Sequence, residues 1–140
     1  MKSSVAISDA PIPKGLYSDG KHWIYFKNER NPSVIEGVCG ELGITNVPDA
    51  IVEITSITMY DFSRTSFSEM IKLMKEFLLP YKGKLIPVVW QLSVEHDTRL
   101  TKTRKSTFLR TQKDIAHSCK FIHVDDEEST HITNKYYYYN

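Results

Sequence analysis

The chain has 140 residues, 41% of them hydrophobic, and its 18 basic and 17 acidic residues leave a net charge of +1. This length supports one sizeable core and is too short for two ordinary domains. The balanced charge argues against a general polyanion binder, and no apolar run is long enough to span a membrane. We therefore expect one soluble, cytoplasmic domain with no signal peptide.

The first 20 residues are predicted to be rich in loops. Residues 4–7 are typical of a short strand, and the prolines, glycines and aspartate that follow indicate a loop and then a turn. Residues 21–27 are dense in aromatic and β-branched side chains, which favours a strand. His22, at the start of this strand, is predicted to face solvent.

A helix is predicted after this strand. Asn31 is a typical N-cap residue, Pro32 suits the first helical position, and Gly43 is a typical end. Apolar residues between them recur at three- and four-residue steps, which predicts one buried face. The nearby glycines fit neither a dinucleotide-binding nor a P-loop pattern, so we expect no cofactor.

The centre of the chain is predicted to be a strand, a helix and a second strand. The first strand, 51–60, changes its apolar phase between Ile54 and Ile57, which indicates a bulge near Thr55. The second strand, 85–94, is apolar on both faces, with Pro87 near its start. The helical crossover between them predicts that the two strands are parallel.

The central helix is predicted to begin with a capping box, in which Ser66 caps the helix and Glu69 reaches back to it. Pro80 is predicted to stop the helix. One face is apolar and is expected to pack against the flanking strands. Its members are Phe67, Met70, Ile71, Met74, Phe77 and Leu78.

The last third of the chain is predicted to hold a third helix at 106–119 and a short closing strand at 120–124. Residues 125–128 are acidic, and four consecutive tyrosines stand at 136–139. We interpret 1–124 as the domain and 125–140 as an acidic, Tyr-rich tail that frays. The expected fold is α/β, a mixed sheet with helices packed mainly on one face.

The stretch from Ile51 to Asp61 resembles the third strand of STAS domains, the fold of anti-sigma-factor antagonists. The resemblance covers residues 22–124 as a pattern of strands and helices. In that family, a serine or threonine after the aspartate is phosphorylated by a partner kinase to control binding. Asp61 and Ser63 match the family positions, whereas Phe62 replaces the usual serine and Arg64 the usual glycine.

The leading hypothesis is a non-enzymatic, regulatory protein-interaction module. A phosphate near a helix N-terminus meets free amides and the positive end of the dipole, which favours a switch there. The alternative is that these hydroxyls only cap the helix. The candidate partner-binding or switch residues are Asp61, Ser63, Arg64, Thr65 and Ser66.

A second hypothesis is a small nucleic-acid-binding protein that uses the basic segment 99–113, whose lysines and arginines would neutralise phosphates. A solvated helix face is the alternative for the same residues. The candidate anion-binding residues are Arg99, Lys102, Arg104, Lys105, Arg110 and Lys113.

A third hypothesis is a hydrolase that uses Glu95, His96 and Asp97, although adjacent residues at a strand end diverge. No catalytic residue is expected. The remaining histidines and Cys119 are spaced too irregularly for a zinc motif, so no metal site is expected. The two cysteines do not make a disulfide framework.

Overall fold

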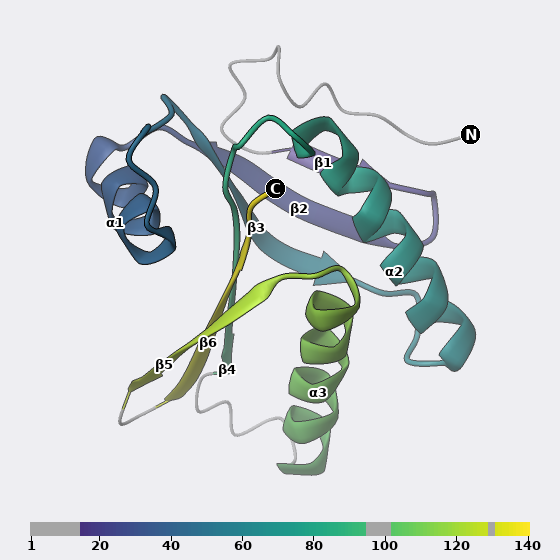
Figure 1. The fold of residues 1–140 in the computed structure, drawn as a ribbon. Helices are drawn as coiled ribbons and strands as arrows, with labels where there is room; N and C mark the ends of the chain where they lie inside the picture. The colour runs from purple at the N-terminus through teal and green to yellow at the C-terminus, as the bar shows by residue number, and fades with distance from the viewer. Residues whose placement is uncertain (1–14, 95–101, 129–130) are drawn as a thin grey trace.

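The computed structural model describes residues 15–94, 102–128 and 131–140, which form a six-stranded mixed sheet with three α-helices (Figure 1). The sheet order is β1-β2-β3-β4-β6-β5. β3 and β4 run parallel, and the other paired strands of the described sheet are antiparallel. The strands are β1 Gly15–Ser18, β2 Trp23–Glu29, β3 Ile51–Thr58, β4 Val88–Val94, β5 Ile122–Glu128 and β6 His131–Tyr138. The helices are α1 Pro32–Leu42, α2 Arg64–Leu78, the 3-10 turn η1 Leu79–Tyr81, and α3 Lys102–Ser118.

Helices cover both faces of the sheet. α2 and α3 lie on one face and α1 lies on the other (Figure 1). β4 shows why both faces are apolar, because Val88 and Trp90 pack under α2 and α3 whereas Val89 packs against α1. The predicted α/β class, with a mixed sheet and helices mainly on one face, is therefore confirmed.

The bulge predicted in β3 is present. Tyr25 of β2 pairs with Ser56, and the next residue, Phe26, pairs with Ile54, so Thr55 is the extra residue. Thr55 and Ser56 are both exposed, whereas Ile54 and Ile57 are buried on the same side of the sheet. The bulge keeps both isoleucines in the core despite the change of phase.

The predicted limits of α1 are also confirmed. The Asn31 side chain accepts a hydrogen bond from the Ser33 amide, and Pro32 is the first helical residue. Gly43 ends the helix in the left-handed conformation, with φ of 69°. These signals are local, which is why the sequence alone predicts them well.

The start of α2 differs from the prediction. Ser63, not Ser66, is the N-cap residue, and the helix begins at Arg64. Glu69 does not complete a capping box, because its carboxylate binds His22 and Lys21.

The strand that follows α2 is also shorter than predicted, since Leu85 has φ of 58° and β4 begins after Pro87.

The predicted C-terminal tail is wrong, because residues 125–140 hold most of two strands. β6 lies between β4 and β5, so its backbone is hydrogen-bonded on both sides. Tyr136 is 0% exposed and packs under α3, whereas Tyr137 is buried against α1. A tyrosine-rich strand is stable here because both sheet faces are covered by helices.

The loop-rich N-terminal segment also needs a correction at residues 15–18. They form β1, which pairs with β2 and ends in the predicted turn. A Cβ atom at Gly15 would overlap the ring of Phe26, so a larger residue there would require this ring to move. The expected strand at 4–7 lies outside the described residues.

Candidate functional site

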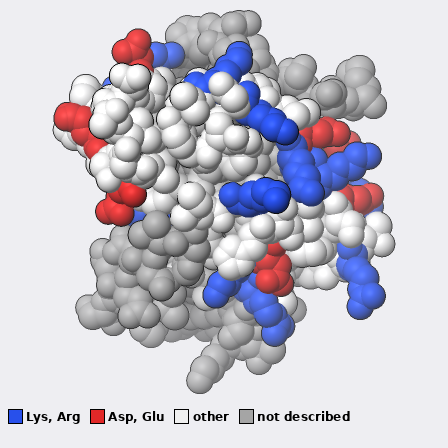
Figure 2. All heavy atoms as spheres, viewed as in Figure 1, with Lys and Arg blue, Asp and Glu red and all other residues white. Residues whose placement is uncertain are grey.

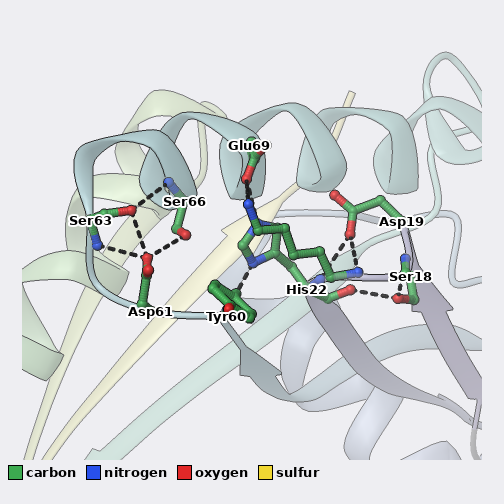
Figure 3. Close-up of polar contacts among 10 residues, drawn as sticks. Ser18, Asp19, His22, Tyr60, Asp61, Ser63, Ser66 and Glu69 are labelled. Atoms are coloured by element: carbon green, nitrogen blue, oxygen red, sulfur yellow. Dashed lines mark hydrogen bonds and ion pairs between the residues drawn. The ribbon is translucent and has the colours of Figure 1, made fainter.

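The candidate site is the β3–α2 hinge, residues 59–66, which joins the exposed end of β3 to α2. Its centre is the Asp61 carboxylate, which lies at the foot of the first turn of α2 (Figure 3). Asp61 Oδ1 accepts hydrogen bonds from the Ser63 hydroxyl at 2.6 Å, the Ser66 hydroxyl at 2.5 Å and the Ser63 amide at 3.0 Å. The hydroxyls of Ser63 and Ser66, followed by the Ser63 amide, lower the pKa of Asp61 to about 2.

Ser63 connects this carboxylate to the helix. Its hydroxyl donates to Asp61 and accepts a hydrogen bond from the Ser66 amide at 3.1 Å. Ser63 itself is exposed, whereas Ser66 is 1% exposed. The two serines are therefore not equivalent, because only Ser63 is accessible to an enzyme in the folded protein.

His22 supports the hinge from the protein interior. Its side chain is 0% exposed, and its Nδ1 accepts a hydrogen bond from the Tyr60 amide at 2.9 Å. The proton is therefore on Nε2, which lies 2.9 Å from Glu69 Oε1 and donates to it (Figure 3). The prediction that His22 faces solvent is wrong, because the imidazole ties β3 to α2 across the start of β2.

The turn before β2 positions this histidine. Asp19 accepts hydrogen bonds from the backbone amides of Lys21 and His22, at 2.9 and 2.8 Å, and the Ser18 hydroxyl donates to the His22 carbonyl. His22 and then Lys21 hold the pKa of Glu69 below its usual range. The hinge is therefore connected to β2 and α2 by a continuous set of polar contacts.

The outer surface of the hinge is aromatic. Tyr60 is 68% exposed and Phe62 is 63% exposed, and they flank Asp61 in the sequence. Lys21 Nζ lies over the Tyr60 ring, 5.1 Å from its centroid. Arg64 and Thr65 are also exposed. The sequence analysis missed the role of these aromatics, although a Tyr-Asp-Phe sequence between a strand and a helix cap was a usable signal.

The structure brings together only part of the predicted site residues. Asp61, Ser63 and Ser66 form one network, and Arg64 and Thr65 lie on the outside of the same turn. The basic residues belong to a separate element, α3, on which Arg110 and Lys113 are exposed. Lys102, Arg104 and Lys105 are in the same helix, but their side chains are outside the described part of the structure, as is Arg99 entirely.

The alternative chemistries gain no support from the described residues. Glu95, His96 and Asp97 lie outside them, and so the hydrolase hypothesis stays a prediction. Within the described ranges, no three His, Cys, Asp or Glu side chains are placed to hold a metal ion. No helix in this part of the chain is long and apolar enough to cross a membrane.

Comparison with known proteins gives no further guidance. The chain matches no protein-family model, no curated protein and no solved structure. The resemblance to STAS domains therefore stays a prediction.

Proposed function

We propose that the chain is a non-enzymatic, regulatory module of STAS-like type that binds a protein partner through the β3–α2 hinge. The observation that carries this proposal is the pair of exposed aromatic side chains, Tyr60 and Phe62, on a turn held by hydrogen bonds from both sides. The partner class is a protein with an apolar pocket that receives these rings.

Two physical features of the hinge favour docking. Large aromatic side chains supply much of the binding free energy at protein interfaces, because they bury a large area with few rotatable bonds. A turn that is already ordered loses less conformational entropy when it binds. The contacts of Asp61 and His22 order the hinge before any partner arrives, and the Lys21 ammonium constrains the Tyr60 ring.

The test is capture of partners from the native host by the wild-type chain and by the double variant Tyr60→Ser, Phe62→Ser. The matched control is Leu79→Ser, Leu85→Ser, which removes two other exposed hydrophobic side chains away from the hinge. We expect a partner that the wild type and the control retain and the hinge variant loses. Equal retention by all three proteins would contradict the proposal.

We further propose that phosphorylation of Ser63 regulates this docking. A phosphate on Ser63 removes the hydroxyl proton that Asp61 accepts and places a second negative charge beside that carboxylate, which is ionised at pH 7. The N-terminus of α2 favours the phosphate, so the group would turn away from Asp61 towards the helix amides. The hinge, and with it Phe62, would then change conformation.

Substitution of Ser63 by glutamate tests this regulation, with Ser68→Glu as the control because Ser68 is exposed on the same helix. We expect partner capture to fall at least fivefold for Ser63→Glu and to stay within twofold for Ser68→Glu. Phosphosite mapping of the native protein should find Ser63 rather than the buried Ser66. Modification restricted to other residues would contradict the proposed regulation through Ser63 but not the proposed docking at the hinge.

We place the module in the cytoplasm as part of the same proposal. Both cysteines, Cys39 and Cys119, are buried as free thiols, which fits a reducing compartment. Imaging of the tagged protein in the native host tests the location.

A further inference from the structure

A pocket of about 540 Å³ lies where the C-terminal ends of α2, α3 and β6 meet, on the same face as α2. Its size is within the range of small-molecule sites in proteins. It shares no residue with the β3–α2 hinge. Its lining comes from Lys75, Leu78, Leu79, Lys82, Ser118, Cys119, Lys120, Tyr138, Tyr139 and Asn140.

The charged side chains of this lining are all basic. Lys75 comes from α2, Lys82 follows η1, and Lys120 follows α3, so three separate segments contribute one ammonium each. No ion pair with these lysines is present among the described residues. Figure 2 shows several basic side chains on this face, with acidic side chains among them.

Lys120 is held in an unusual backbone conformation. Its φ is 68°, in the left-handed region where glycine is the common residue after a helix. Its amide donates to the His117 carbonyl, which closes the last turn of α3.

Helix ends alone do not account for this charge. The C-termini of α2 and α3 each carry about half a negative charge, which a nearby lysine stabilises. Three full positive charges exceed these two half charges together with the terminal carboxylate of Asn140 in the titrated chain, so the pocket is net positive. Cys119 adds no negative charge at pH 7, because burial raises the pKa of its thiol to about 11.

The remaining walls are largely apolar. Leu78 is buried beneath the pocket, Leu79 is exposed at it, and Tyr138 and Tyr139 supply half-buried aromatic surface. The Gly83 amide donates to the main-chain oxygen of Asn140 at 2.9 Å, which holds the segment after β6 against the turn that follows η1. The pocket therefore offers an apolar wall for a ring or short chain and ammonium groups for an anionic end.

We propose that this pocket binds a small organic anion, with a phosphate or carboxylate at the three lysines and an apolar ring or chain against Leu78 and the two tyrosines. Ammonium groups suit both kinds of anion as point charges, and the apolar wall adds contact area that inorganic phosphate lacks. This site is independent of the proposed protein-docking function.

Calorimetric titration of the full chain tests the proposal, with 1-naphthyl phosphate and 1-naphthoate as the two anionic probes. 1-Naphthol and inorganic phosphate are the controls for the ring and for the anion. The variant is Lys75→Gln, Lys82→Gln, Lys120→Gln. The matched variant is Arg30→Gln, Lys72→Gln, Lys84→Gln, which removes the same charge from exposed basic residues outside the pocket.

We expect at least one anionic probe to bind the wild type, with a Kd at least tenfold lower than that of either control probe. The pocket variant should weaken this Kd at least tenfold and the matched variant less than twofold. Thermal unfolding checks that each variant is folded. If the triple variant is not folded, Lys82→Gln alone replaces it and is expected to raise the Kd of the anionic probe at least threefold. Absence of binding, equal loss in both variants, or equal affinity for inorganic phosphate would overturn the proposal.

Discussion

Ser63 has two roles at the hinge, since it caps α2 and donates to Asp61. Replacing an N-cap serine with alanine leaves a helix amide without its partner and typically costs about 1 kcal/mol. We predict that Ser63→Ala lowers the free energy of unfolding by about this amount in urea denaturation. Ser68→Ala, inside the same helix, should change it by less than half as much. A larger loss for Ser68→Ala would show that Ser63 is not the cap.

The lowered pKa of Asp61 predicts a specific dependence of stability on pH. Its pKa in the folded protein is about 2, below the ordinary 3.8, so folding favours the ionised carboxylate. The resulting stabilisation is fully present above about pH 4 and is lost as the pH falls from 3.8 through 2. We predict that the difference in thermal stability between the wild type and Asp61→Asn is constant from pH 7 to 5 and shrinks between pH 4 and 2. A difference that persists unchanged at pH 2 would contradict this.

At the scale of elements, the bulge in β3 predicts that deletion of Thr55 destabilises the protein less than deletion of Glu53. Removing Thr55 leaves Ile54, Ser56 and Ile57 in regular alternation against β2, with both isoleucines still facing the core. Removing Glu53 instead shifts Ile51 and Val52 by one position and exchanges them between the two cores, for which neither side chain is shaped. We predict that the Thr55 deletion folds and is at least about 2 kcal/mol more stable than the Glu53 deletion.

The measurement is denaturant unfolding of both deletion variants, followed by the near-UV circular dichroism of the buried aromatic residues. If the Thr55 deletion is as destabilising as the Glu53 deletion, the extra residue is needed for more than the phase of the strand. That result would point to a role of the bulge in aiming the hinge.

Sequence reasoning succeeded where the deciding contacts are local. The caps of α1 lie within a few residues of each other, and the β3 bulge is visible as a change of phase in one strand. The predicted start of α2 was wrong because the deciding contact is not local. Glu69 follows Ser66 at capping-box spacing, but its partner is His22, which is 47 residues away in the chain.

The same limit explains the missed site residues. Tyr60 and Phe62 have the composition of core residues, and their exposure becomes visible only once the hinge is placed on the surface. The three lysines of the pocket lie on separate segments that only the folded chain brings together. Family resemblance indicated the hinge as a position of interest, although it emphasised the hydroxyls over the rings.

At the scale of the whole molecule, β6 makes the last residues part of the core. It pairs with β4 and β5, and Tyr136 and Tyr137 reach the two opposite cores of the sheet. Truncation after residue 124 removes this strand and leaves β4 with an uncovered edge. We predict that the truncated chain shows no cooperative thermal unfolding transition.

Removal of Tyr139 and Asn140 alone is the control, because these residues follow β6 and leave the strand order intact. The shorter deletion should lower the unfolding temperature while keeping one cooperative transition. A cooperative transition in the chain that ends at 124 would restore the boundary inferred from the sequence and would contradict a core role for β6.

The claim that the hinge is a docking surface is tested most directly by site-specific photo-crosslinking in the native host. p-Benzoylphenylalanine is placed at Phe62 or, as a control of similar exposure, at Leu79. We predict a discrete crosslinked protein species from position 62 that is missing from position 79 and is lost when Tyr60→Ser is added. The same species from both positions, or none from position 62, would contradict it.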